Sequence, residues 1–227
     1  MSEELILKTK IMKKTFILCL IAIFTATVAF TQKTEKELKK EVKEKAMKEA
    51  QKEAKSLTKQ GWKTSPGSLP LDKLVESAWM KQLQVDENGL PMYITADGNG
   101  VAETKSVAEA QALEFAKLQL AGSIESNIAS IVKGNLANAQ ESAQEATSVT
   151  EIIQSSKNII AQQLGYINPN FKLYRDLKDK KIEVQVRIFY ETKQSFAIAK
   201  KAIRKELKEK LKKTDEEVDK LLQEAPK

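Results

Sequence analysis

The chain has 227 residues, a formal charge of +7 and 41% hydrophobic residues, which is the composition of a globular protein with one domain of ordinary size and extensions. Only 6% of the residues are aromatic, whereas Ala, Lys, Glu and Gln are abundant, so we expect helix to dominate. Histidine is absent, so the chain lacks the commonest general base near neutral pH and the commonest transition-metal ligand.

Residues 1–31 have the pattern of a cleavable signal peptide. Lys13 and Lys14 precede an apolar run, residues 15–30, which is shorter than the ~20 apolar residues of a membrane span. Small residues ahead of Gln32 favour cleavage at that point. We therefore expect an exported protein that is periplasmic or associated with the outer membrane.

Cys19, the single cysteine, lies inside the apolar run and not at its end. This position is too early for a lipid anchor, so we expect no lipidation and a mature protein without disulfides or thiol chemistry. Glu3 and Glu4 do not suit the start of a signal peptide, and Met12 is therefore the expected initiator.

Residues 32–60 are predicted to form a charged helical extension. Lys alternates with Glu around an N-terminal stripe of apolar residues with helical spacing: Leu38, Val42, Ala46, Ala50, Ala54 and Leu57. Such a helix docks on a partner, docks on its own domain, or frays into a linker. Gly61 and Pro66 end it, and Trp62, which stands in this break, is expected to be a packed lid residue and not a ligand platform.

Residues 61–191 are predicted to form an α+β domain. In chain order we expect a short helix over residues 71–83, a strand over 92–97 closed by a turn at 98–100, a helix over 108–131, a loop or weak helix over 133–147, and a second core helix over 149–164 that stops at Gly165. Residues 182–190 alternate apolar and polar side chains and should pair with residues 171–175 as a hairpin.

A long amphipathic helix is predicted over residues 192–227, with a C-terminal stripe of Phe196, Ala199, Ile203, Leu207, Leu211, Val218 and Leu221. The predicted fold is a three-stranded, mostly antiparallel sheet with two helices packed on one face, plus long N- and C-terminal helices.

Several of these features resemble the lipoprotein-twenty family of small bacterial envelope proteins, which is also similar to the amino-terminal domain of a flagellar assembly protein. The matching residues are the strand 93–97, the glycines up to Gly100, the helix marked by Ala108, Ala112, Ala116, Leu120 and Ala121, and the hairpin through Tyr174, Asp176 and 184–188. The stretches Gly61-Trp62-Lys63, Pro66-Gly67 and Leu69-Pro70-Leu71 are also similar to exported proteins of Bacteroidetes-type bacteria. The resemblance covers residues 61–191 and implies a fold and an envelope location, with no catalytic residues.

No catalytic, cofactor-binding or metal-binding residues are predicted, and we expect no enzyme. The carboxylate pairs Glu216/Glu217 and Asp97/Glu103 lie among lysines and are expected to be solvated. The residues 86–89 resemble the start of a calcium loop, but its far glutamate is missing.

The function we predict is that of a non-catalytic envelope protein, a protein-binding or structural module whose partner is another envelope protein or a second copy of the chain. One alternative is a periplasmic holdase chaperone with basic helical arms. Another is peripheral contact with anionic lipid or peptidoglycan through Lys200, Lys201, Arg204, Lys205 and Lys208. Nucleic acid is not expected because Lys alternates with Glu, and no small-molecule substrate is expected.

The candidate partner-binding residues fall into two sets, Leu38, Val42, Leu57 and Trp62 near the N-terminus, and Lys200, Lys201, Arg204 and Lys208 near the C-terminus. If the N-terminal and C-terminal stripes are already packed within the chain, the chaperone hypothesis weakens. If both helices project freely, it gains support.

Overall fold

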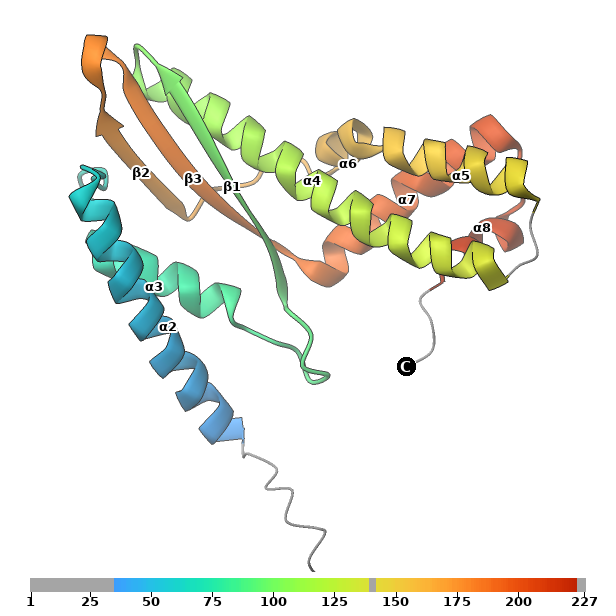
Figure 1. The fold of residues 1–227 in the computed structure, drawn as a ribbon, viewed down its shortest axis with the longest axis horizontal. Coiled ribbons are helices and arrows are strands. Elements are labelled where there is room, and N and C mark those ends of the chain that lie inside the picture. The colour runs from blue at the N-terminus through green and yellow to red at the C-terminus, as the bar shows by residue number, and fades with distance from the viewer. Residues whose placement is uncertain (1–34, 139–141, 224–227) are drawn as a thin grey trace, which may run out of the picture. The chain divides into compact units, whose positions relative to one another are not determined.

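The computed structural model describes residues 35–138 and 142–223, so the predicted signal peptide lies outside the described part. Contacts divide the chain into two units, Met1–Glu41 and Val42–Lys227, and the first contributes only the start of α2. The elements in chain order are α2 (Glu35–Lys59), α3 (Leu71–Gln82), β1 (Tyr93–Ala102), α4 (Lys105–Asn138), α5 (Ala143–Ser155), α6 (Lys157–Gln163), β2 (Phe171–Asp176), a 3-10 turn (Lys178–Lys180), β3 (Ile182–Glu191), α7 (Thr192–Leu211) and α8 (Asp215–Leu222) (Figure 1).

The three strands form one antiparallel sheet in the order β1-β3-β2. Phe171 pairs with Arg187, so β2 and β3 are the predicted hairpin, joined by a polar turn. The alternation along β3 sends Val184, Val186 and Ile188 to one face, where they are fully buried. The predicted α+β class is confirmed.

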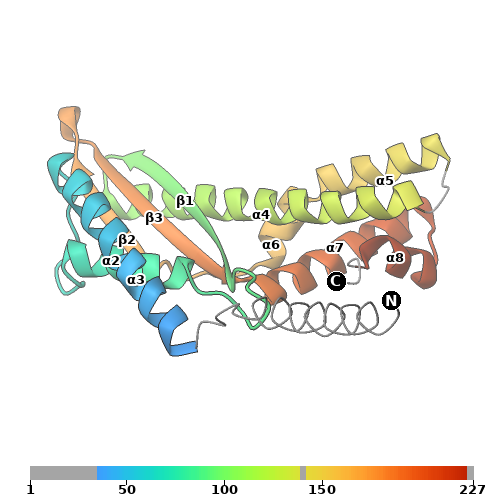
Figure 2. The ribbon, with the colours of Figure 1, turned by 60° about the horizontal axis from the view of Figure 1, so that its bottom comes forward.

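The main hydrophobic core lies on the face of the sheet that α4 covers. Its members come from β1, β3 and α4 to α8, and the largest include Leu120, Ile124, Ile128, Ile153, Ile160, Ile188, Ile203 and Leu207. Figure 2 shows α4 running beside the sheet and then on past it, where it contacts α5, α6, α7 and α8. One helix therefore serves both the sheet and the group of helices beyond it.

A second core lies on the opposite face, beneath α2 and α3. Ala50, Ala54 and Leu57 of α2 and Leu74, Val75 and Ala78 of α3 pack with Trp62, Phe171 and Leu173. The alternation of β3 predicts one covered face only. The other face is covered because β2 turns Phe171 and Leu173 toward it.

Gly98 and Gly100 do not form the predicted turn, because β1 continues through them to Ala102. They lie where the strand touches α4: a Cβ atom at Gly98 would stand 2.0 Å from the carbonyl oxygen of Ala112, and one at Gly100 would stand 2.1 Å from that of Ala108. The small residues on both sides allow a strand and a helix to approach until their backbones touch.

The segment predicted as a loop or weak helix after residue 132 is a helix up to Asn138. Val132 and Leu136 are buried in the main core and hold this part of α4 in place. The side-chain amide of Asn135 donates hydrogen bonds of 2.8 Å to the carbonyl oxygens of Leu221 and Gln223. These carbonyls lie at the end of α8, where the helix itself supplies no donor. Tertiary contacts outweigh the weak helical propensity of this stretch.

The predicted second core helix is broken at Ser156. This residue is fully buried, and its hydroxyl donates a 2.6 Å hydrogen bond to the carbonyl oxygen of Ile153, which competes with the helical ladder. The chain therefore forms α5 and α6, and it turns at Gly165 with φ of 65°, as the sequence predicts.

The prediction of a single long C-terminal helix is wrong, because the chain forms two helices there, α7 and α8. Lys212 adopts the left-handed conformation with φ of 55°, and Thr214 begins α8 with a capping box to Glu217. Lys213, buried between the two helices, pairs with Glu145 of α5. The C-terminal stripe thus folds back on itself and fills the main core.

Candidate protein-binding site

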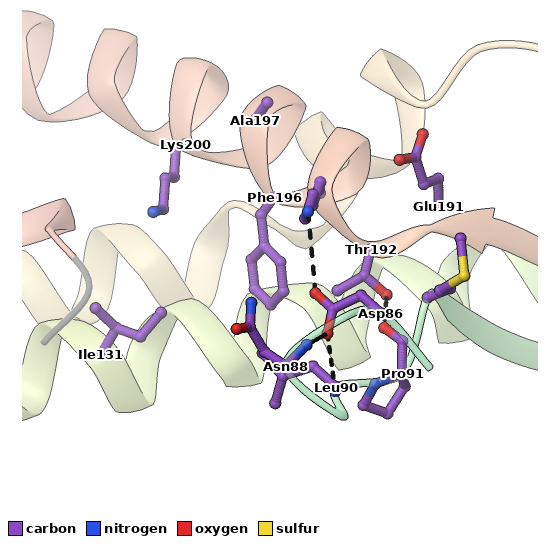
Figure 3. Close-up of a pocket in the computed structure, with 12 residues that line it drawn as sticks. Asp86, Asn88, Leu90, Pro91, Ile131, Glu191, Thr192, Phe196, Ala197 and Lys200 are labelled. Atoms are coloured by element: carbon purple, nitrogen blue, oxygen red, sulfur yellow. Dashed lines mark hydrogen bonds and ion pairs between the residues drawn. The ribbon is translucent and has the colours of Figure 1, made fainter. Parts of the chain in front are cut away.

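A pocket of about 550 Å³ lies between the loop before β1, the start of α7 and one residue of α4 (Figure 3). We call it the α7 pocket. Its lining residues are Asp86, Asn88, Leu90, Pro91, Met92, Ile131, Glu191, Thr192, Lys193, Phe196, Ala197 and Lys200.

The loop wall of the pocket is shaped by Asp86. One carboxylate oxygen accepts hydrogen bonds from the backbone N–H groups of Asn88 (2.9 Å) and Leu90 (3.0 Å), and the backbone N–H of Asp86 donates to the carbonyl of Leu90. Gly89 supplies the left-handed position, with φ of 75°. The calcium-like pattern is therefore an Asx turn, and among the residues that the structure describes no group of three His, Cys, Asp or Glu side chains is placed to hold a metal ion.

The loop is fastened to the first turn of α7. The backbone N–H of Thr192 donates to the carbonyl of Met92 at 2.8 Å, and the Thr192 hydroxyl donates to the carbonyl of Pro91 at 2.8 Å. The ammonium of Lys193 lies 3.9 Å from the carboxylate of Asp86. These contacts hold the pocket wall in place without help from a ligand.

The floor of the pocket is apolar and its surroundings carry charges of both signs. Leu90 and Met92 are 45% and 37% exposed, and the ring of Phe196 points from α7 toward the loop in Figure 3. Glu191 and Lys193 are exposed beside them. An apolar centre inside a polar border is typical of a protein-binding surface.

A cluster of ion pairs occupies the sheet face under α2. Arg187 donates to both carboxylate oxygens of Asp97 (2.7 and 3.1 Å) and to Glu53 of α2 (3.1 Å), and the Glu53 carboxylate also accepts from the indole of Trp79 at 2.5 Å. Burial opposes the charge of Arg187, yet the hydrogen bonds and charge of Asp97, with Glu53, raise its pKa above the ordinary value. Asp97 is thus engaged in an ion pair that docks α2, and it is not half of a free carboxylate pair.

Two of the four predicted residues of the N-terminal set, Leu57 and Trp62, lie in the second core beneath α2 and α3. Leu57 and Trp62 are each 7% exposed, and the guanidinium of Arg175 lies 4.6 Å above the Trp62 ring, so Trp62 is the packed residue that the sequence predicts. Val42 is half-buried on α2. Leu38 belongs to α2, but its side chain lies outside what the structure describes.

The predicted residues of the C-terminal set divide between two places. Lys200 lines the α7 pocket, and Lys201 is exposed on the next position of the helix. Arg204 pairs with Asp215 (3.3 Å) and Asp219 of α8.

Lys208 pairs with the same Asp215 at 2.9 Å. Its hydrogen bond and charge lower the pKa of the Asp215 carboxyl below the ordinary value, with a further contribution from Arg204. Two basic residues of α7, Arg204 and Lys208, are therefore paired with acidic residues of the helix that folds back on it.

The structure does not bring the two predicted sets together. Ala50, Ala54 and Leu57 of the N-terminal stripe pack in the second core, and the C-terminal stripe packs in the main core. Sequence reasoning missed Leu90 and Met92, although the Asp86-Asn88-Gly89 turn was a signal that an ordered loop stood beside them.

None of the helices in the described ranges combines the length and apolar character that crossing a membrane requires. The chain matches no protein-family model, no curated protein and no solved structure.

Proposed function

We propose that this chain is a non-catalytic, exported envelope protein that binds another envelope protein through the α7 pocket. The observation that carries the proposal is the exposure of Leu90 and Met92 on a loop held rigidly by hydrogen bonds, beside the apolar ring of Phe196. A preformed apolar patch needs little ordering when a partner binds. Its apolar centre and its mixed border suit an apolar side chain of a partner protein.

Export is the part of this proposal that rests on sequence. The signal-peptide pattern of residues 1–31 and the resemblance to the lipoprotein-twenty family both support an envelope location, and the early position of Cys19 supports a protein without a lipid anchor.

The buried stripes favour a binding module over a holdase chaperone. A holdase needs apolar helix faces that are open to clients, whereas Ala50 and Leu57 of the N-terminal stripe and Ile203 and Leu207 of the C-terminal stripe are buried. Binding to an anionic surface through α7 loses support for a similar reason, because Arg204 and Lys208 already pair with α8.

The test is site-specific cross-linking in the bacterium that makes the protein. A photo-reactive residue at Leu90 should join the chain to one protein of the envelope fraction, and the same residue at Lys178, which is exposed on the turn between β2 and β3, should not. Met92→Asp should abolish the adduct because it places a charge in the apolar patch. Val85→Asp changes an exposed valine near this loop that does not line the pocket, and it should leave the adduct unchanged.

Two results would contradict the proposal. One is the absence of any envelope adduct at Leu90 in cells where the folded chain is abundant. The other is an adduct that forms equally at Lys178 and survives Met92→Asp.

A further inference from the structure

The outer edge of β1 carries a row of backbone groups that face away from the sheet. The N–H of Thr192 donates to the carbonyl of Met92, so these two residues form a hydrogen-bonded pair just before the β1-β3 ladder. This pair determines which residues of β1 bond to β3. Because hydrogen-bonded and non-bonded pairs alternate in an antiparallel ladder, the N–H and C=O groups that point outward belong to the odd residues. These are Tyr93, Thr95, Asp97, Asn99 and Val101, and within the described ranges no hydrogen bond reaches their backbone groups.

The opposite edge of the sheet is handled differently. On β2, the N–H and C=O of Tyr174 face outward and both pair with the backbone of Lys63, at 2.9 and 2.8 Å. No described segment pairs with the outer edge of β1 in this way. The strand also contains neither a lysine nor a proline, the residues that commonly prevent a free edge from pairing with another strand.

Two exposed apolar side chains of α4 stand beside this edge. Gln111 flanks β1 closely, since its Cβ lies 2.8 Å from where a Cβ of Gly100 would be. Val107 and Phe115 lie one turn before and one turn after Gln111 on the same side of the helix, and they are 50% and 57% exposed.

The other side of α4 faces β2 and is occupied. The ammonium of Lys105 lies 3.9 Å from the ring of Tyr174, and Glu109 pairs with Lys172 at 2.8 Å. The exposed large apolar side chains of this part of α4, Val107 and Phe115, therefore lie on the side of the open edge.

We propose that the outer edge of β1 binds an extended segment of another polypeptide, which adds to the sheet as a fourth strand. The backbone groups of the five odd residues supply the hydrogen bonds, and Phe115 and Val107 contact apolar side chains at alternate positions of the incoming segment. Glu103 and Glu114 are exposed near this surface, so the segment is neutral or basic.

The position of α4 argues for a bare segment and against a second copy of this chain. Paired strands lie about 4.8 Å apart, whereas packed helices need about 8–10 Å between their axes. Because α4 touches the backbone of β1 at Gly98 and Gly100, a second β1 paired at this edge would bring its own α4 into the space of the first. An extended segment brings no helix with it. This surface and the α7 pocket use different residues, so either proposal can fail without the other.

The probe is a library of random peptides long enough to span β1, displayed on phage and selected on the purified chain. Selected peptides should alternate apolar residues and favour Lys and Arg over Asp and Glu. Thr95→Pro removes an outward N–H that the β1-β3 ladder does not use, and Phe115→Ala removes the apolar contact. Each variant should weaken peptide affinity about tenfold.

Matched controls are available for both variants. Lys172→Pro removes an outward N–H on β2, and Val85→Ala shortens another exposed valine far along the sequence from α4. Neither should change peptide affinity. If Thr95→Pro fails to fold, Phe115→Ala and N-methylation of the peptide decide: methyl groups at alternate peptide residues should abolish binding, and those at the residues between should not.

Bound peptide should also slow amide hydrogen exchange at the outward N–H groups of β1. Four outcomes would overturn the proposal: no peptide is selected, binding is unaffected by Phe115→Ala, exchange slows only around the α7 pocket, or the purified chain forms a dimer that Thr95→Pro dissociates, which would make a second copy the occupant.

Discussion

Gly98 of β1 lies so close to Ala112 of α4 that a Cβ atom on the glycine would stand 2.0 Å from the alanine carbonyl oxygen. Backbone occupies that position and cannot rotate away, so Gly98→Ala must push α4 off the sheet. We expect the free energy of unfolding to fall by about 3 kcal/mol, the upper range for overpacking a core. Urea denaturation followed by circular dichroism measures this change.

Gly134 provides the control for that experiment. It lies inside α4 with nothing within 4 Å of a Cβ position, so Gly134→Ala should stabilise the chain by about 0.5–1 kcal/mol through the helical preference of alanine. Equal effects of the two substitutions would show that helical propensity, and not contact with the sheet, governs this region.

Val186 is fully buried at the centre of β3, between Gly98 of β1 and Lys172 of β2. An unpaired carboxylate at this position costs several kcal/mol, which is comparable with the whole stability of a domain. Val186→Asp should therefore abolish cooperative unfolding and leave the chain open to proteolysis. Val101→Asp, at a 43% exposed strand position, should fold normally, and a soluble, cooperative Val186→Asp protein would refute the topology.

Arg187 holds α2 against the sheet by pairing with both Asp97 and Glu53, and its own side chain is only 11% exposed. Arg187→Met should lower the free energy of unfolding by about 2–3 kcal/mol because it leaves two carboxylates without their partner. In a double-mutant cycle with Glu53→Gln, the two losses should not add. Strict additivity would mean that the pair contributes nothing to docking α2.

The hairpin of α7 and α8 should loosen in acid. The hydrogen bond from Lys208 lowers the pKa of Asp215, and the backbone and side chain of Thr214 lower the pKa of Glu217. A carboxyl whose pKa is lower in the folded chain than in the unfolded chain stabilises the fold at pH values above its unfolded-state pKa. This stabilisation is lost as the pH falls through the folded-state pKa. The protection of α8 amides against exchange, relative to the intrinsic exchange rate at each pH, should therefore fall below about pH 4.

Asp215→Asn combined with Glu217→Gln tests this assignment. In the variant, the α8 amides should be less protected already at neutral pH, and their protection should depend less on pH in the acid range. Unchanged acid sensitivity in the variant would locate the acid-labile groups elsewhere.

Elements could be predicted from the sequence where the spacing of apolar residues matched one type of element with one buried face. The alternation along residues 182–190 identified β3 and its hairpin partner, and the helical spacing over residues 108–131 identified most of α4. The glycines at 98 and 100 were misassigned because a tight turn and a backbone contact with a helix call for the same residue. The break after Lys212 has a local signal, because Thr214 and Glu217 have the spacing of a capping box, whereas the break at Ser156 accompanies complete burial of that residue, which no local pattern shows.

The α7 pocket could not be assembled from sequence because its walls come from three distant segments, the loop of residues 86–92, Ile131 and the start of α7. Taken alone, each segment is accounted for by its secondary structure, as a turn, part of a helix or the start of a helix. The outer edge of β1 was hidden for a related reason, since a strand becomes an edge only when the order of all strands is known.

The contact between Gly98, Gly100 and the alanines at 108, 112 and 116 also constrains how the sequence can diverge. A Cβ atom at either glycine would meet backbone atoms of α4, so replacing an alanine of the helix with glycine would not make room for it. Descendants of this protein can exchange their surface charges and lengthen their loops, but two glycines separated by a single residue, followed eight positions later by alanines at every fourth position, should be inherited intact. That spacing is the signature by which distant kin can be recognised.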